Sequence, residues 1–318
     1  MSVKPRVLVA HNDTPQCAVD KLKEKFDVTV MNKNWPTSQE VLSIIKDYDA
    51  LLGKIHIDGA FLDAAGTRLK VISTPSAGYE HMNIQEIKKR GIKVGHIRDV
   101  LSAAVAEIAF YLLLGAIRRA REGRLLLEQG KIEHGFQWLL GHDLVNKTAG
   151  IVGLGSIGIE IARRLKSFQV SRILYTGHKK KPAADEFHAE FVLFDTLLKE
   201  SDFVICCVPL TPETTKMFNA DAFKKMKNTA VFVNIGRGMT VDTEALVHAL
   251  SNGTIFAAGL DVTEPEPLPT SHQLMKLPNA VVIPHMGSQT VETRNSMANA
   301  AAQNILNFFE GKPLLYEL

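Results

Sequence analysis

The stretch AGIVGLGSIGIEIARRL, residues 149–165, decides the fold class. It begins with apolar residues typical of a buried strand and ends with apolar residues at helical spacing. Between them stand Gly153, Gly155 and Gly158, in the spacing Gly-x-Gly-x-x-Gly. Glycines in this context permit a tight turn, a close approach of a pyrophosphate, and packing of helix on strand. The stretch predicts a dinucleotide-binding turn; the alternative is a glycine-containing turn without a ligand.

The expected contacts with the dinucleotide come from this turn and the helix that follows it. Backbone N–H groups and the dipole at the start of the helix would hold the pyrophosphate. The predicted contact residues are Gly153, Leu154, Gly155, Ser156, Ile157 and Gly158.

The next strand pattern ends in ILYTGHKKKP, residues 173–182. An NAD site usually has an Asp or Glu here, about 20 residues past the glycine turn, to bind the ribose 2′-hydroxyl. This chain instead has Thr176, Gly177, His178, Lys179 and Lys180. Ammonium groups attract a 2′-phosphate, which a carboxylate would repel. The stretch therefore predicts NADP as the preferred cofactor, with NAD possible; the alternative is a solvated basic turn.

Strand and helix patterns alternate on both sides of this region. One series runs from residue 6 to residue 97, a long helix is expected at about 103–128, a second series starts at residue 147, and a last helix is expected at 291–310. This alternation predicts an α/β fold of two Rossmann-like, doubly wound parallel-sheet domains with a ligand cleft between them. We expect residues 102–287 to form the dinucleotide-binding Rossmann domain. Residues 1–101 and 288–318 are expected to form a flavodoxin-like substrate-binding domain.

Composition excludes several classes of function. The 318 residues are 46% apolar and 22% charged with a net charge of +3, which argues against nucleic acid as the main partner. Cys17, Cys206 and Cys207 have no metal-ligand spacing, so we expect reduced core thiols, no metal site and a cytoplasmic protein. The longest apolar stretch, residues 101–117, contains Glu107 and is short for a membrane span, so no membrane partner is expected.

Three later stretches carry candidate catalytic groups. VFVNIGRGMTVD (231–242) has Arg237 between glycines after a strand, where a guanidinium could hold a carboxylate by two parallel hydrogen bonds. GLDVTEPEPLP (259–269) has Glu264 and Glu266 among prolines, which would fix a carboxylate in place. VVIPHMGSQT (281–290) has His285, a common proton donor, at the end of a buried strand. The alternatives are a surface arginine, a solvated loop and a structural histidine.

Taken in order, these stretches resemble a known family. GLGSIG, PLTPET, NIGRG, GLDVTEPEP and PHMGS are similar to the successive motifs of D-2-hydroxyacid dehydrogenases, and STPSAGYEHM (73–82) resembles their substrate-carboxylate loop. The match runs from the first strand pattern to the last helix pattern. Within the family, VISTPSAG, IKKRGIKVG and LDVTEPEPLP most resemble the animal reductases of glyoxylate and hydroxypyruvate.

The resemblance implies a role for each matching residue. Arg237 would bind the substrate carboxylate and carbonyl oxygen. His285 would protonate that oxygen as hydride arrives from the nicotinamide. Glu266 would pair with His285, because a neighbouring carboxylate favours the protonated imidazole. Asp261 would hold the carboxamide of the nicotinamide.

The resemblance also implies contacts outside the catalytic group. Backbone N–H groups of Ala77 and Gly78 would bind the substrate carboxylate, and Ser288 would lie beside the substrate. Trp138 resembles a residue that such enzymes insert into the neighbouring subunit's site, which implies a homodimer; the alternative is core packing. Pro209 and Ile235 are expected to line the cofactor.

The resemblance implies NADPH-dependent reduction of small 2-oxo acids: hydroxypyruvate to D-glycerate and glyoxylate to glycolate. The chain departs from the family pattern at Glu80, where the family usually has Asp, and in using lysine where relatives more often have arginine. One alternative is another D-2-hydroxyacid dehydrogenase, such as a phosphoglycerate dehydrogenase. The other is a nucleotide-sensing protein like the corepressors that share this fold.

Overall fold

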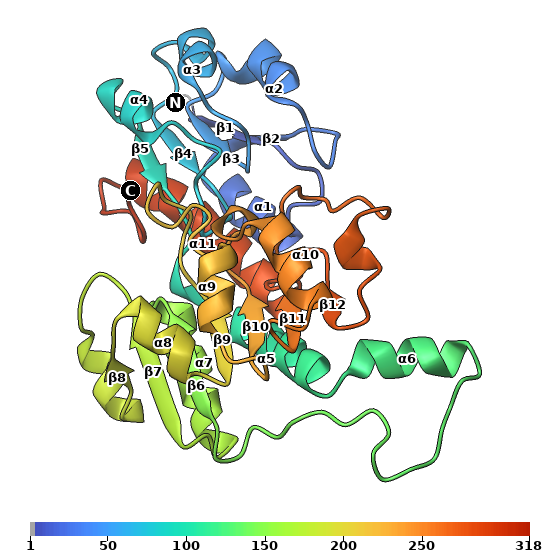
Figure 1. The fold of residues 1–318 in the computed structure, drawn as a ribbon. Helices are drawn as coiled ribbons and strands as arrows, with labels where there is room; N and C mark the ends of the chain where they lie inside the picture. The colour runs from blue at the N-terminus through green and yellow to red at the C-terminus, as the bar shows by residue number, and fades with distance from the viewer. Residues whose placement is uncertain (1–3) are drawn as a thin grey trace. The chain divides into compact units, whose positions relative to one another are not determined.

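The computed structural model describes residues 4–318 and consists of two compact units (Figure 1). The first comprises the chain up to Leu101 together with Gln289–Leu318. The second comprises Ser102–Ser288, so Ser288 belongs to the second unit. Both units are α/β folds on parallel sheets, as the alternating pattern predicts.

The first unit has a five-stranded sheet in the order β2-β1-β3-β4-β5, which is the order of flavodoxin-like folds. All its paired strands are parallel. The central strands are short and made mostly of Val, Ile and Leu, because helices cover both faces of the sheet. The strands are β1 Arg6–Val9, β2 Asp27–Val30, β3 Ala50–Leu52, β4 Val71–Ser73 and β5 Lys93–Gly95.

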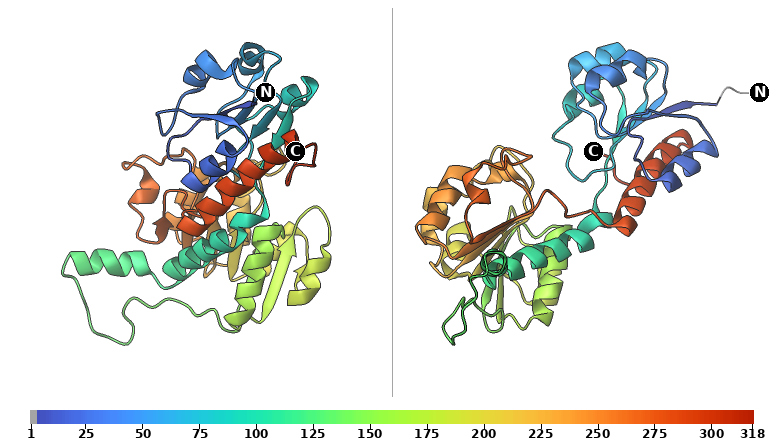
Figure 2. Two further views of the ribbon diagram at one scale, coloured as in Figure 1. Left: turned by 180° about the vertical axis from the view of Figure 1, so that it is seen from behind. Right: turned by 90° about the vertical axis from the view of Figure 1, so that its right-hand side faces the viewer.

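The helices of the first unit form two groups on opposite faces of its sheet (Figure 2). On one face α1 (Gln16–Lys23) packs against α11 (Val291–Phe309), the helix expected at 291–310. On the other, neighbouring helices pack in turn: α2 (Ser38–Ile45), α3 (Gly59–Ala65) and α4 (Ile84–Lys89). The short helix η1 (Asp99–Leu101) ends the first segment of the unit.

The second unit has a seven-stranded sheet in the order β12-β11-β10-β9-β6-β7-β8. Because the chain moves outward from β6 to β8 and then returns to β9, the strand order reverses between β6 and β9. Ligands of doubly wound folds bind at the carboxyl ends of the strands near such a reversal. The strands are β6 Thr148–Val152, β7 Arg172–Thr176, β8 Glu190–Phe191, β9 Phe203–Cys206, β10 Val231–Asn234, β11 Ala257–Leu260 and β12 Ala280–Val282.

Helices cover this sheet, and aromatic side chains fill much of the core beneath them. Phe218, Phe223 and Phe232 are fully buried and contact one another. The α-helices are α5 Ser102–Ile117, α6 Ala120–Glu128, α7 Ser156–Ser167, α8 Phe194–Glu200, α9 Ala220–Lys225 and α10 Thr243–Ser251. Three short 3-10 helices accompany them: η2 Pro182–Phe187, η3 Gly238–Thr240 and η4 Gln273–Met275.

The prediction of a single long helix at 103–128 is wrong, because the chain forms two helices, α5 and α6, with a break between them. Arg119 adopts the left-handed region with φ 54°. The backbone N–H of His142 donates to the carbonyl of Ile117 (3.2 Å), so the returning chain takes an acceptor that a continuous helix would use internally. Figures 1 and 2 show α6 and the following loop extending away from the sheet of this unit, and α6 has no buried residue.

The length argument against a membrane span and the core interpretation of the thiols need correction. The apolar stretch Asp99–Ile117 is, by length and composition alone, long enough to cross a membrane. However, 61% of this apolar stretch is buried inside the protein. Its helix α5 packs against α7, β10 and β11, as a core helix does. The core interpretation of the three thiols is wrong for Cys17, which is exposed; Cys206 is buried and Cys207 is half-buried.

Candidate functional site

The glycine turn lies between β6 and α7, in the context that the motif requires. Gly153 has φ +98°, a conformation that side chains other than glycine's rarely adopt. A Cβ on Gly158 would lie 2.4 Å from the carbonyl oxygen of Gly153, whereas a Cβ on Gly155 would meet nothing within 4 Å. The first N–H groups of α7, beginning at Ser156, have no intrahelical acceptors. The turn is therefore close-packed on its helix side and open at Gly155, which fits a dinucleotide pyrophosphate.

The basic turn follows β7, the strand next to β6. Thr176 is half-buried, and Gly177, His178, Lys179 and Lys180 are exposed. Within residues 4–318, no hydrogen bond or ion pair involves the side chains of His178, Lys179 and Lys180. The hydroxyl of Tyr175 accepts a hydrogen bond from the Lys181 backbone N–H (2.9 Å) and so fixes the turn to its strand.

An acid near this turn comes from the loop after β9, which the motif PLTPET forms. The pKa of Glu213 is lowered, first by a hydrogen bond from Thr211 and in smaller part by the nearby charge of His178. The sequence analysis missed this acid because it lies 35 residues beyond His178 in the chain. The carboxylate of Glu213 therefore lies near the basic turn.

His285 and Glu266 meet directly, although 19 residues separate them. The Nδ1 of His285 lies 2.6 Å from Oε1 of Glu266, and because a carboxylate oxygen accepts, Nδ1 carries the proton. The other carboxylate oxygen of Glu266 accepts from the backbone N–H of Thr263 (3.4 Å). Both side chains are partly open, with exposed fractions of 42% and 43%. Within residues 4–318, Nε2 of His285 has no hydrogen-bond partner and is available to hold or release a proton.

Asp261 fixes the backbone around His285. Its carbonyl accepts from the N–H of His285 (2.8 Å), and its carboxylate accepts from the N–H groups of Met286 (2.5 Å) and Gly287 (3.0 Å). Burial raises the pKa of Asp261, while these N–H groups and His285 act in the opposite direction. His285 has φ 51°, an uncommon conformation for a residue other than glycine, and these bonds hold it there.

Arg237 follows β10 in a turn that buried polar groups hold. Asn234 is fully buried; its amide donates to the carbonyl of Arg237 (2.9 Å) and accepts from the N–H of Gly236 (3.0 Å). The Thr240 hydroxyl donates to the same Arg237 carbonyl (2.7 Å). A Cβ on Gly238 would lie 1.9 Å from the carbonyl oxygen of Thr263, so this turn packs backbone to backbone against the loop that leads to Glu266. The turn that carries the half-buried Arg237 and the loop that carries Glu266 therefore pack directly against each other.

The loop that resembles a substrate-carboxylate loop follows β4 in the first unit. The carbonyls of Ser76, Ala77 and Gly78 each accept a hydrogen bond: from the N–H of Ile97 (3.0 Å), from Nδ1 of His96 (3.2 Å) and from the hydroxyl of Ser76 (2.8 Å), respectively. The N–H groups of Ala77 and Gly78 donate no hydrogen bond within the described chain, residues 4–318. They are therefore available to an anion.

The remaining predicted residues lie at several places. Ile235 is buried after β10, and its N–H donates to the carbonyl of Cys206; the carbonyl of Pro209 accepts from Thr214 (2.7 Å). Ser288 is half-buried, three residues after His285. Trp138 is half-buried in the loop after α6 and does not belong to the buried core.

Sequence reasoning missed the polar residues that hold the site, namely Asn234, Thr263 and His96. The only signal for Asn234 was a polar residue at the end of an apolar strand, and Thr263 and His96 gave none.

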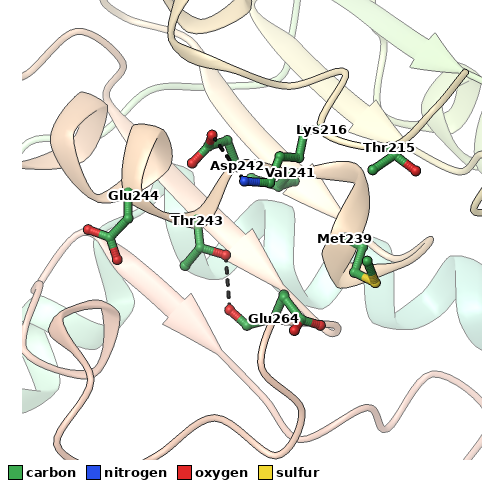
Figure 3. A pocket seen from close by; sticks show the side chains of 8 residues that line it. All are labelled: Thr215, Lys216, Met239, Val241, Asp242, Thr243, Glu244 and Glu264. Carbon is green, nitrogen blue, oxygen red and sulfur yellow. Dashed lines mark hydrogen bonds and ion pairs between the residues drawn. The ribbon is translucent and has the colours of Figure 1, made fainter. Parts of the chain in front are cut away.

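A shallow hollow of about 200 Å³ lies next to the candidate catalytic segments (Figure 3). Lys216 pairs with Asp242 at its edge (3.6 Å), and the Thr243 hydroxyl donates to the carbonyl of Glu264 (3.0 Å). Arg237, Glu266 and His285 do not line it, so it is distinct from the candidate catalytic group. Its lining residues are Thr215, Lys216, Met239, Val241, Asp242, Thr243, Glu244 and Glu264. Within residues 4–318, no group of three His, Cys, Asp or Glu side chains is arranged to hold a metal ion.

Comparison with known proteins identifies the class to which this fold and these groups belong. The family described as D-isomer specific 2-hydroxyacid dehydrogenase, NAD binding domain, matches residues 110–287. The chain belongs to this family. It is therefore an oxidoreductase that acts on a CH–OH group with a nicotinamide cofactor.

Individual relatives narrow the class. The chain is 51% identical over 265 residues to the glyoxylate reductase/hydroxypyruvate reductase of Homo sapiens, a match covering 83% of this chain and 81% of that protein. It is 43% identical to the glyoxylate reductase of Thermococcus onnurineus, covering 98% of this chain and 94% of that one. A structure of the NADPH-dependent glyoxylate/hydroxypyruvate reductase of Sinorhizobium meliloti, in complex with NADP and malonate, aligns with TM-score 0.86 and 31% identity, covering 99% and 97% of the two chains.

Proposed function

We propose that this protein reduces glyoxylate to glycolate and hydroxypyruvate to D-glycerate, with NADPH as the preferred reductant. The observation that carries the proposal is the 2.6 Å contact between Nδ1 of His285 and Glu266, which leaves Nε2 to serve as a proton donor. The names of the relatives support the substrates, because several of them are glyoxylate or hydroxypyruvate reductases.

The proposed chemistry assigns His285 to the reacting carbonyl. The nicotinamide, when bound, supplies the hydride that reduces the carbonyl carbon. Nε2 of His285 donates the proton to the carbonyl oxygen, and Glu266 stabilises the imidazolium before that transfer. Asp261 fixes the backbone of His285 and is the proposed acceptor for the nicotinamide carboxamide.

The proposed carboxylate contacts are the N–H groups of Ala77 and Gly78 together with Arg237. The two N–H groups have no acceptor within residues 4–318, and amides aimed at an anion bind it without reorganising. The guanidinium of Arg237 is held by its turn, where Nη1 donates to the Gly236 carbonyl (2.7 Å). Ser288 would lie beside the substrate.

The proposed cofactor contacts are residues 153–158, Pro209 and Ile235, with the basic turn holding the 2′-phosphate. Lys179 and Lys180 are exposed and make no ion pair within residues 4–318, so their charges are available to a phosphate. Lysine is a point charge without the bidentate fork of arginine. We therefore propose a preference for NADPH in which NADH is still used.

We also propose a homodimer joined through the extended segment around α6. This helix has no buried residue, and large apolar side chains nearby are exposed: Leu127 (53%), Ile132 (46%), Phe136 (100%) and Leu140 (52%). A second copy of the chain would cover them, and Trp138 would then reach the partner's substrate. Location in the cytoplasm remains a prediction from cysteine usage.

The experiment that tests the function measures NADPH oxidation with glyoxylate and hydroxypyruvate, and then repeats the measurement with NADH. We expect turnover of both oxo acids and a higher kcat/KM with NADPH. The double variant Lys179→Ser/Lys180→Ser should lose most of the preference, whereas Lys224→Ser, an exposed lysine on α9, should keep it. Equal use of both cofactors by the unmodified protein would contradict the role of the lysines. Cofactor binding without turnover would favour a nucleotide-sensing protein.

A further inference from the structure

The peptide groups of the loop at residues 76–79 are held by hydrogen bonds that come partly from outside the loop. Three successive carbonyls, those of Ser76, Ala77 and Gly78, accept hydrogen bonds from protein groups. In a trans peptide the carbonyl of one residue points opposite to the N–H of the next. Holding these carbonyls therefore aims the N–H groups of Ala77, Gly78 and Tyr79 away from the donors. The donors thus decide where the anion-binding N–H groups point.

We propose that His96 is a positioning residue for substrate binding, acting through the carbonyl of Ala77 to aim the N–H of Gly78 at the substrate carboxylate. Of the three donors, the N–H of Ile97 is a backbone group, and the Ser76 hydroxyl belongs to the loop itself. The imidazole of His96 is thus the side chain from another segment that orients the central peptide unit. The inference rests on the proposed function, because it concerns the loop assigned there to the carboxylate.

The position of the His96 ring is fixed from several sides. Its backbone N–H donates to the carbonyl of Tyr316 (3.0 Å), and its carbonyl accepts from the buried amide of Asn304 (3.2 Å). The ring makes edge contacts with Tyr79 at 5.8 Å and with Tyr316 at 6.3 Å between centroids. These contacts restrict rotation of the ring and so keep Nδ1 within hydrogen-bonding distance of the Ala77 carbonyl.

The protonation state agrees with this role. Burial lowers the pKa of His96, partly offset by the bond to Ala77; Arg98 lowers it further and Asp99 raises it. A neutral imidazole has one N–H, and a carbonyl can only accept, so the proton is on Nδ1. The hydrogen bond therefore exists without a charge on the ring, and no cation is needed beside the substrate loop.

The test compares two variants of His96 in the full chain with saturating NADPH. His96→Phe keeps an aromatic ring between Tyr79 and Tyr316 but has no donor. His96→Asn places an amide nitrogen where Nδ1 stands and so restores the donor. The probes are the KM for glyoxylate and hydroxypyruvate, and the Kd for oxalate, an unreactive carboxylate anion. His248→Phe, an exposed histidine on α10, is the matched control.

We expect His96→Phe to raise the KM and the oxalate Kd about five- to tenfold, the size of one lost hydrogen bond, with kcat within about twofold and NADPH affinity unchanged. His96→Asn should recover most of the loss, and His248→Phe should show none. An unchanged oxalate Kd in His96→Phe would overturn the inference, as would equal losses in the Phe and Asn variants.

The two proposals can fail separately. If the unmodified protein reduces no 2-oxo acid, the proposed function fails, but a His96-dependent oxalate Kd would still support the positioning role. If the unmodified protein turns over glyoxylate but His96→Phe has the same oxalate Kd as the unmodified protein, the proposed function is supported and the positioning role of His96 is refuted.

Discussion

Replacing Gly238 by alanine should separate the Arg237 turn from the loop that carries Glu266. The new Cβ would lie 1.9 Å from the carbonyl oxygen of Thr263 and 2.1 Å from its carbonyl carbon. Real Cβ atoms essentially never approach another heavy atom closer than 3.0 Å, so the gap must open by at least 3.0 − 1.9 = 1.1 Å. Both obstructing atoms belong to the backbone, and no side chain can rotate out of the way. The displacement must therefore move one of the two candidate catalytic segments.

The cost follows from that displacement. Overpacking of this kind typically costs about 1–3 kcal/mol of stability. For a folding unit of this size, that corresponds to an unfolding temperature lowered by roughly 2–12 °C. A misplacement of about 1 Å between reacting groups costs on the order of a hundredfold in rate. We therefore expect kcat/KM for hydroxypyruvate to fall by about two orders of magnitude while the protein remains folded at 25 °C.

The assay pairs initial rates with thermal unfolding, and Gly59→Ala serves as the control. Gly59 begins α3, and a Cβ there would meet nothing within 4 Å. The control should keep both its rate and its unfolding temperature. If Gly238→Ala keeps kcat/KM within about twofold, the packing of the two loops does not position the catalytic group, and the reasoning is refuted.

Three further predictions concern single side chains. His285→Gln should lose kcat by more than about tenfold without a change in unfolding temperature, and near-normal turnover would remove His285 from its role. Arg237→Ala should raise the KM for the oxo acid steeply, which an unchanged KM would contradict. Burial alone would raise the pKa of Asp202, but the Thr148 N–H and the Lys227 ammonium outweigh it and lower the pKa. A carboxyl with a lowered folded-state pKa stabilises the protein above its unfolded-state value, and that stability is lost as pH falls through the folded-state pKa. Asp202→Asn should therefore flatten the fall of unfolding temperature below about pH 4, and parallel curves would count against the assignment.

The fold could be predicted from the sequence because its two decisive signals, the glycine turn and the alternation of strand and helix patterns, each lie within short stretches of the chain. The glycine turn between β6 and α7 could be predicted because Gly153 is required by its positive φ and Gly158 by its close approach to the Gly153 carbonyl, both within one short segment. The alternation of strand and helix patterns is likewise enough to indicate parallel sheets. The break at Arg119 could not be predicted, since it depends on His142 supplying a donor from a returning loop.

The candidate catalytic side chains could be predicted by type but not by geometry. Glu266 lies in the motif GLDVTEPEP and His285 in the motif PHMGS, and the resemblance pairs them. Their 2.6 Å contact, however, depends on the path that the chain takes from β11 through β12. Cys17 illustrates the opposite case. The absence of metal-ligand spacing predicts a core thiol for Cys17 as for the other two cysteines, yet the fold leaves it exposed.

Three residues whose backbone contacts could not be predicted from the sequence share one physical property. Asn234 binds the backbone of the Arg237 turn, Asp261 binds the backbone beside His285, and His96 binds the backbone of the loop at residues 76–79. Because every residue carries the same backbone carbonyl and N–H, such a bond leaves no complementary side chain in the sequence to reveal it. Each of these residues stands at or just beyond the carboxyl end of a parallel strand, where the next loop passes within reach. A polar side chain at that position is therefore a candidate for positioning the adjacent loop, and removing its donor or acceptor should affect ligand binding before it affects the fold.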